Sequence, residues 1–169
     1  VAILLGAMQR LKALRPTADL YFAATCQEEI GSYGAAMSAF GVDPDYAVAL
    51  DVCHAKTPGA PDLHTKKLDA LVASQGPYIH QMLRRKLMET AEKNNIDVQT
   101  AIVPRATSTD ADSINIKRNG VPTILLELPL KYMHTTVELI DMHTLEEGAR
   151  LLAHFAAAVS PEWEDELWT

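Results

Sequence analysis

The sequence predicts an α/β protein, a layered sandwich in which a mostly parallel sheet is flanked by helices. Short apolar runs typical of buried strands alternate along the chain with longer stretches of helical periodicity. The 169 residues suit one domain with a substantial core, since 48% of them are hydrophobic and 22% are charged. The expected elements are helix 1–14, strand 20–25, helix 32–40, strand 46–52, strand 68–73, helix 78–93, strand 98–103, helix 110–118, strand 122–128 and helix 144–159.

The first four elements are defined by periodicity and by residues that break it. The apolar residues of the first segment, Val1–Leu14, recur at helical spacing, and Pro16 ends the helix. The sequences LYFAAT (20–25) and YAVALDV (46–52) are continuous apolar runs of strand length. Small residues between them favour a short helix that Gly41 stops.

In the second half of the sequence, the elements are predicted mainly from residues that begin or end helices. Pro77 is expected to open the long helix and Asn94 to close it, while Gly120 closes the next helix. Glu146 lies in the first turn of the last helix, where the helix dipole favours an acid. The three remaining apolar runs are of strand length, so strands and helices keep alternating, as in a parallel sheet.

Composition argues against several function classes. The net charge is −7 and Lys and Arg form no cluster, so nucleic acid is an unexpected partner. The longest apolar run, Val1 to Met8, is far shorter than the ~20 residues of a membrane span, and we expect no membrane association. Cys26 and Cys53 give no disulfide framework, which favours a cytoplasmic location.

Three predicted strands lead into polar residues that chemistry could use. Glu28 and Glu29 follow the first of these strands, Asp51 ends the second, and His134 follows the last. Ligands of α/β sheets bind beyond the carboxyl ends of the strands, so these four side chains could meet at one edge. Carboxylates with an imidazole suit Zn²⁺, Mn²⁺ or Co²⁺.

Each of these residues also has a structural explanation of its own. Adjacent acids are common at helix N-termini, an aspartate can form a strand-end turn, and a loop histidine needs no ligand. Gly31 permits a turn after the glutamates, so that one carboxylate could bind metal while its neighbour serves as a general base. Together, the four residues favour a metal site.

A second polar segment, 107–112 (TSTDAD), lies between a predicted strand and a predicted helix. A Ser, Thr or Asp there could cap the helix. The same residues could form a wall of a substrate pocket, and one residue could do both. The sequence leaves these two roles open.

The motifs ATCQEEIGSYGA, ALDVCHAKTPG, TSTDAD and GVPTILLELPLKYMHTTVE, in this order, resemble the glutamyl and deblocking aminopeptidases. These co-catalytic dimetal enzymes have a zinc-peptidase-like fold and often form homo-oligomeric dodecamers. The resemblance runs from Val1 to about Val159 and implies two divalent metal ions (Zn, Co or Mn) and a peptide substrate. The implied roles are general base for Glu28, metal ligands for Glu29, Asp51 and His134, and substrate binding for Thr109, Asp110 and Tyr132.

The resemblance also implies parts that this sequence does not contain. The family needs a further histidine ligand, a bridging aspartate and a small dimerisation domain, all in an N-terminal part. Val1 already lies in a helical pattern. We therefore expect residues 1–160 to be the C-terminal part of a catalytic domain, followed by an acidic tail over 161–169. We expect this chain alone to bind one metal ion or none and to have little peptidase activity.

One departure from the family pattern concerns the pocket segment. Many members have two glycines where this chain has Thr107 and Ser108, which affects the preferred first residue of the substrate.

Three other functions stay open. The alternatives are another dimetal hydrolase of the carboxypeptidase or deacylase kind, a glycoside hydrolase, and a non-catalytic structural or partner-binding remnant. Glycosidase carboxylates lie ~5–9.5 Å apart on opposite sides of a bond, so adjacent Glu28 and Glu29 match that chemistry poorly.

Overall fold

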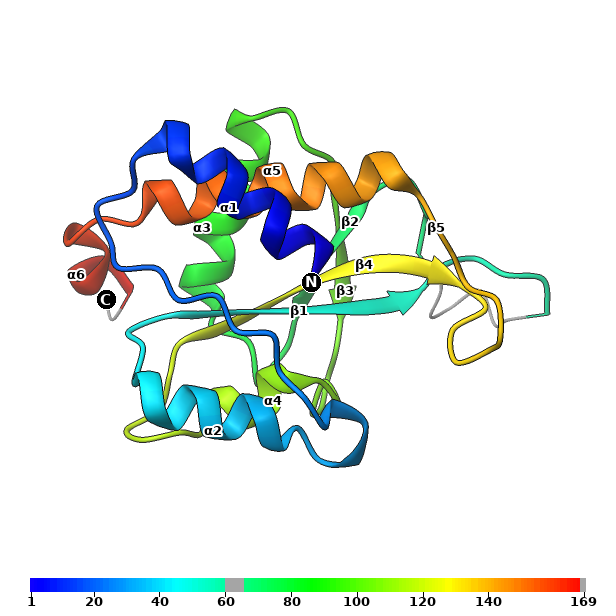
Figure 1. The fold of residues 1–169 in the computed structure, drawn as a ribbon, viewed down its shortest axis with the longest axis horizontal. Coiled ribbons are helices and arrows are strands. Elements are labelled where there is room, and N and C mark those ends of the chain that lie inside the picture. Colours follow the sequence, from blue (N-terminus) through cyan, green and yellow to red (C-terminus); the bar gives the residue numbers. More distant parts are fainter. Residues whose placement is uncertain (60–65, 168–169) are drawn as a thin grey trace.

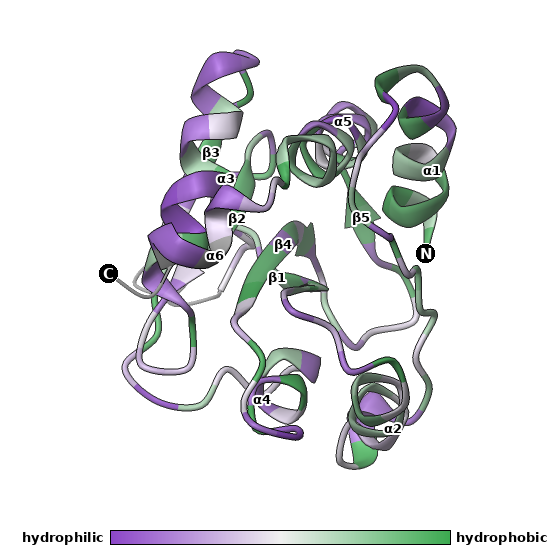
Figure 2. Ribbon diagram, turned by 90° about the vertical axis from the view of Figure 1, so that its left-hand side faces the viewer, coloured by the Kyte–Doolittle hydropathy of each residue, from purple (hydrophilic) through white to green (hydrophobic). Residues whose placement is uncertain are grey.

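The protein folds into three layers, with a mixed sheet between two groups of helices (Figure 1). The structure, a computed structural model, describes residues 1–59 and 66–167. The elements in chain order are α1 (Ala2–Leu14), η1 (Glu28–Ile30), α2 (Tyr33–Val42), β1 (Ala47–His54), β2 (Leu71–Gln75), α3 (Gln81–Lys93), β3 (Val98–Ile102), α4 (Asp110–Ile114), β4 (Thr123–Lys131), β5 (Leu139–Ile140), α5 (Met142–Ala158) and α6 (Glu162–Leu167). Helices α1, α3 and α5 cover one face of the sheet, and α2 and α4 cover the other (Figure 2). The predicted α/β sandwich is confirmed.

The five-stranded sheet has the order β1-β4-β2-β3, with β5 paired to β4. Its longer ladders, β1 with β4 and β2 with β3, are parallel. The two parallel pairs are joined by a short antiparallel contact between β2 and β4. Strands β1 and β4 therefore end at the same edge, which brings Asp51 near the loop that follows β4.

The two faces of the sheet carry different side chains. Leu71 packs against α5, since a Cβ added to Gly148 would lie 3.2 Å from its Cδ2 atom. Successive strand residues point to opposite faces, so Val72 and Ser74 face α2 and α4. Val72 pairs with Glu127, and Glu127 pairs with Asp51. The face toward α4 thus receives two carboxylates and a hydroxyl.

Tight helix pairing closes the opposite face. Helix α1 crosses α5 where a Cβ on Gly6 would lie 2.8 Å from the Cβ of Ala149, so only glycine allows this approach. The buried residues of α1 lie on the side of the helix that faces this crossing, and they are Ile3, Ala7 and Leu11. In the described part of the chain, no helix is long and apolar enough to cross a membrane.

The predicted strand over 20–25 is wrong. This segment connects α1 to η1 and pairs with no described strand. Leu20 and Phe22 do pack against the core, which explains the apolar pattern, whereas Tyr21 is 70% exposed. A strand needs a neighbour for its N–H and C=O groups, and β1 pairs within the described sheet only with β4.

Several helix ends also differ from their predicted positions. Helix α2 continues through Gly41 to Val42, and α3 begins only at Gln81, where the His80 side chain accepts a hydrogen bond from the Leu83 N–H. Helix α4 ends at Ile114 instead of 118. Arg118 has φ 53° and donates to the Phe40 carbonyl, a backbone state and a contact that a continuing helix would not allow.

The stretch expected to form an acidic tail contains the short helix α6. Its Trp163 is buried and packs against Phe155, with ring centroids 5.5 Å apart. Lys86 of α3 approaches the same indole ring at 5.3 Å and forms an ion pair with Glu166. Residues 168–169 of the expected tail lie outside the described part.

Candidate metal centre

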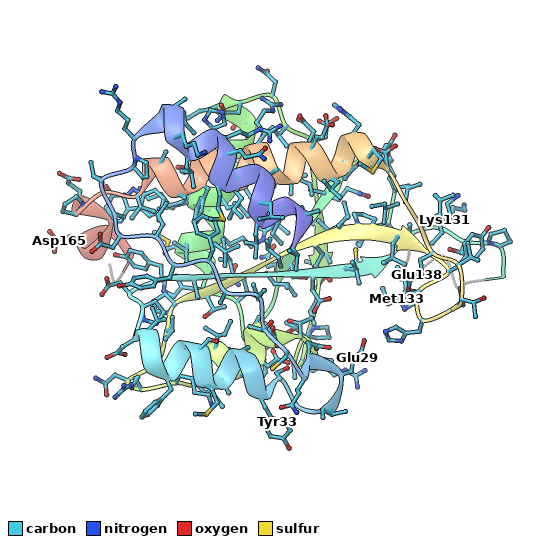
Figure 3. All side chains as sticks on the ribbon, in the orientation of Figure 1. Glu29, Tyr33, Lys131, Met133, Glu138 and Asp165 are labelled. Carbon is cyan, nitrogen blue, oxygen red and sulfur yellow. The ribbon has the colours of Figure 1, made fainter. Side chains whose placement is uncertain are left out.

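The predicted ligands Glu29 and His134 lie in contact. Nε2 of His134 is 3.2 Å from Oε1 of Glu29, and the side chains are 69% and 73% exposed. Figure 3 shows Glu29 at the same end of the molecule as Met133 and Glu138, which belong to the loop after β4. Two ligands ~2.1 Å from one tetrahedral ion would be about 3.4 Å apart. The observed separation therefore fits a shared metal ion.

Left-handed backbone conformations aim both side chains. Gln27 (φ 62°) and Gly31 (φ 129°) flank η1, and Tyr132 (φ 61°) and His134 (φ 60°) shape the other loop. The His134 N–H donates to Oε1 of Glu138 at 2.8 Å, which fixes the loop. Non-glycine residues in this region are uncommon, and they cluster at functional sites.

Glu28, the predicted general base, sits among charges. Partial burial is the main cause that raises its pKa above the ordinary value, and the carboxylates of Asp51, Glu29 and Asp110 raise the pKa further. The imidazole of His134 opposes this effect. A raised pKa brings a carboxylate closer to neutral pH, where a general base works best.

Asp51 lies near the pair but is held separately. Its Oδ1 accepts a hydrogen bond from the Val52 N–H at 2.7 Å. Burial raises the pKa of Asp51 and that backbone bond lowers it, while Asp110 and Glu29 raise it further. Within residues 1–59 and 66–167, no three side chains of His, Cys, Asp or Glu are arranged to hold one metal ion. Glu29 and His134 thus form a contacting pair, and Asp51 is not part of it.

The segment 107–112 is built around one carboxylate. Asp112 accepts hydrogen bonds from the Thr107 N–H at 3.0 Å, the Thr107 hydroxyl at 2.8 Å and the Ser108 N–H at 2.7 Å. Thr109 caps α4 by accepting from the Ala111 N–H, so the predicted cap is confirmed. Ser108 has φ 59°, a conformation that glycine adopts without strain. A serine at this position therefore carries a local conformational cost that glycine would avoid.

The predicted substrate residues differ in their placement. We call Glu28, Glu29, Asp51 and His134 the cluster. Asp110, the first residue of α4, contributes to the raised pKa values of two of its members, Glu28 and Asp51. Thr109 is buried, and its hydroxyl also bonds the Thr107 hydroxyl at 2.9 Å. Tyr132 is 44% exposed, and its carbonyl accepts from the Thr135 hydroxyl. Among the described residues, no hydrogen bond or ring contact joins the Tyr132 side chain to Glu28, Glu29, Asp51 or His134.

Sequence reasoning missed two residues beside this cluster. Glu127 is buried on β4, where its Oε2 accepts from the Ser74 hydroxyl at 2.6 Å. Burial raises the pKa of Glu127 to about 7, although the Ser74 hydrogen bond lowers it. A lone acid within the apolar run ILLELPL could have drawn attention to Glu127. Thr25, which bonds Asp110, had no comparable signal.

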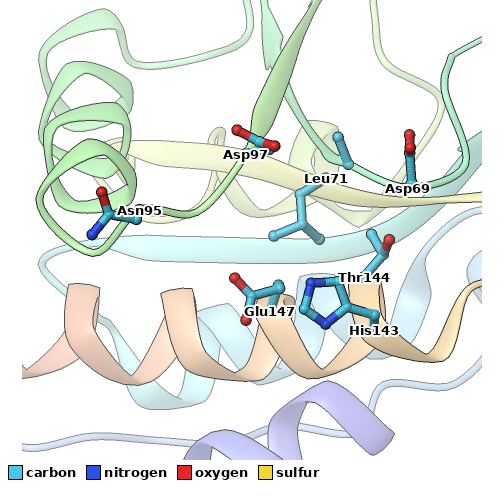
Figure 4. A pocket seen from close by; sticks show the side chains of 8 residues that line it. Asp69, Leu71, Asn95, Asp97, His143, Thr144 and Glu147 are labelled. Carbon is cyan, nitrogen blue, oxygen red and sulfur yellow. The ribbon is translucent and has the colours of Figure 1, made fainter.

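A separate small pocket lies near the N-terminus of α5, at the start of β2 (Figure 4). Asp69, Asp97, His143 and Glu147 are among its lining residues. Its volume of about 70 Å³ holds a few water molecules and no aminoacyl group. Glu147 is already paired with Arg150, so we place no chemistry there.

The chain is similar in sequence to known aminopeptidases. The family described as M42 glutamyl aminopeptidase matches residues 1–151. A lysyl aminopeptidase of Pyrococcus furiosus is 37% identical over 145 residues, covering 85% of this chain and 42% of the relative. The chain thus spans less than half the length of that protein.

Solved structures give the same result. An aminopeptidase of the archaeon Desulfurococcus kamchatkensis superposes with a TM-score of 0.89 at 29% identity, covering 99% of this chain and 48% of its own. The TET1 peptidase of Pyrococcus horikoshii, which can assemble into a tetrahedron or a large octahedral shell, has a TM-score of 0.64 at 29% identity. That comparison covers 80% of this chain and 40% of the TET1 chain.

Proposed function

Because the chain belongs to the M42 glutamyl aminopeptidase family, we propose that Glu28, Glu29, Asp51 and His134 are part of the active site of a metal-dependent aminopeptidase. The complete enzyme would release N-terminal residues from peptides. The observation that carries this proposal is the 3.2 Å contact between His134 and Glu29, which comes from two loops far apart in sequence. The curated relative is about twice as long as this chain, so the activity is proposed for the complete protein.

Glu29 and His134 would hold one divalent ion, since their separation and donor chemistry suit Zn²⁺, Co²⁺ or Mn²⁺. Asp51 would bind a second ion. The bound ions would supply Lewis acidity, which polarises the scissile carbonyl and lowers the pKa of water. Further ligands would come from outside the described residues.

Glu28 would move the proton. Its carboxylate would take a proton from the attacking water as the water oxygen bonds to the carbonyl carbon. The same proton would pass to the leaving amine nitrogen when the C–N bond breaks. The raised pKa of Glu28 supports this role, because the group must both accept and release the proton near neutral pH.

Asp110, Thr109 and Tyr132 would contact the peptide. A cluster of carboxylates attracts a cation, and every aminopeptidase substrate presents an ammonium group at its N-terminus. We assign recognition of that group to Asp110, the carboxylate at the start of α4.

Homo-oligomeric assembly is also part of the proposal, by similarity to the TET1 peptidase of Pyrococcus horikoshii.

Metal binding by this chain tests the proposal. After treatment with a chelator, the chain would be titrated with Zn²⁺ by calorimetry beside the double variant Glu29→Ala/His134→Ala. Asp69→Ala/His143→Ala is the matched control, because it removes one carboxylate and one imidazole from the small pocket of Figure 4. We expect the wild type and the control to bind Zn²⁺ equally, and the Glu29/His134 variant to bind at least about 100-fold more weakly.

Equal Zn²⁺ affinity in all three proteins would contradict the assignment of the ligands. A wild-type chain that binds no Zn²⁺ would contradict a half-site carried by these residues.

A further inference from the structure

Thr25 joins two parts of the candidate site that are distant in sequence. Its hydroxyl donates a hydrogen bond to Oδ2 of Asp110 at 2.6 Å. Thr25 lies just before the turn that carries Glu28, whereas Asp110 is the first residue of α4. This bond therefore ties the segment of the proposed general base to the segment of the proposed substrate contact.

The other oxygen of Asp110 is left without a partner. Oδ1 is shielded from solvent and accepts no hydrogen bond among the described residues. Among the described residues, the bond from Thr25 is therefore the one hydrogen bond that holds the Asp110 side chain. The Asp110 carboxylate also contributes to the raised pKa values of Glu28 and Asp51.

Asp112, two residues later, provides the contrast. Both of its oxygens are occupied by donors from Thr107 and Ser108. Asp112 therefore holds its own loop and has little capacity for a ligand. Asp110 is held through one oxygen only, by a residue from a different loop.

We infer that Thr25 is a positioning residue, whose hydroxyl holds the Asp110 carboxylate at the candidate site, where its charge would attract the N-terminal ammonium group of a peptide. Without this bond the short aspartate side chain could rotate toward free N–H groups at the start of α4. The inference rests on the proposed function of Asp110.

The test measures binding of L-alaninamide to the metal-free chain by ¹H–¹⁵N NMR titration. N-acetyl-L-alaninamide, which lacks the ammonium group, serves as the matched probe. The proteins are the wild type, Thr25→Val (similar shape, no hydroxyl), Thr25→Ser (hydroxyl kept) and Asp110→Asn. We expect Thr25→Val and Asp110→Asn to weaken L-alaninamide binding about fivefold or more. Thr25→Ser should stay within about twofold of the wild type.

The outcomes separate Thr25 from the proposed function. Wild-type affinity in Thr25→Val, with loss in Asp110→Asn, would overturn the role of Thr25 and leave Asp110 as the ammonium contact. Equal weakening by Thr25→Val and Thr25→Ser would also overturn it, since the hydroxyl would not matter. A wild-type chain that does not prefer L-alaninamide over the acetylated probe would contradict the substrate role of Asp110 itself and, with it, that of Thr25.

Discussion

The two faces of the sheet follow different rules. Toward α1 and α5 the contacts are apolar and close, with Leu71 and Ile3 packed around Gly148. Toward α4 the sheet presents Asp51 and Glu127, and the neighbouring loops use left-handed residues such as Gln27 and His134. Close apolar packing stabilises a fold, whereas strained loops and gathered carboxylates cost stability and persist where they serve function. Variants on the two faces should therefore separate stability from ligand binding.

The largest effect on stability is expected on the apolar face. Leu126 is 1% exposed and pairs with Ala73, so it points to the same face as Leu71. Leu126→Ala should lower the free energy of unfolding by about 3 kcal/mol, since it leaves a cavity in a close-packed core. Urea unfolding followed by circular dichroism measures this. Leu5→Ala, at a position that is 55% exposed, is the matched control and should cost less than about 1 kcal/mol.

Glu127 tests the polar face, and its effect should depend on pH. Burial raises the pKa of Glu127 to about 7, from an ordinary value of 4.5. The folded state therefore binds the proton more tightly than the unfolded state. The stabilisation that protonated Glu127 gives to the folded state is complete below pH 4.5 and is lost as pH rises through 7. Glu127→Gln should match the wild type near pH 4.5 and exceed its stability by roughly 3 kcal/mol above pH 8.

A matched control for this pH dependence is Glu146→Gln, because Glu146 is exposed. At such a surface position the substitution should change the free energy of unfolding by less than about 1 kcal/mol. A flat difference for Glu127→Gln would mean that the buried carboxyl does not titrate in this range. Gln can still accept the hydrogen bond from Ser74, so a loss of that contact would not explain the result.

The smallest effect on stability is expected at the cluster itself. Glu29 and His134 are 73% and 69% exposed, so Glu29→Ala/His134→Ala should change the free energy of unfolding by no more than about 0.5 kcal/mol. The same variant should lose Zn²⁺ affinity. Thermal unfolding without metal measures the first effect. A large loss of stability would mean that the pair holds the loops together and that the two faces are not separable.

Sequence patterns predicted the parts of the fold that one segment determines by itself. The helical spacing of Val1–Leu14 is a local property, and α1 follows it closely. The run LYFAAT has a strand pattern because Leu20 and Phe22 pack against the core, but a strand also needs a partner beside it. The antiparallel junction between β2 and β4 depends on how the chain crosses the sheet, which local patterns do not encode.

The candidate site was predictable to a similar degree. The rule that ligands lie beyond strand ends selected His134, which follows β4. It selected Glu29 through the predicted strand over 20–25, which the structure lacks, although the two side chains do meet. Their roles remain predictions. Thr25 could not be selected from the sequence, because its bond to Asp110 depends on the approach of two distant loops. Contacts of this kind follow from the tertiary structure alone.

We propose that Glu29 and His134 form half of a metal centre. Anomalous diffraction at the zinc absorption edge, from crystals of this chain grown with Zn²⁺, tests it most directly. We predict one strong peak about 2.0–2.2 Å from both a Glu29 carboxylate oxygen and Nε2 of His134. Zinc bound only elsewhere, or no peak between these two side chains, would contradict the claim.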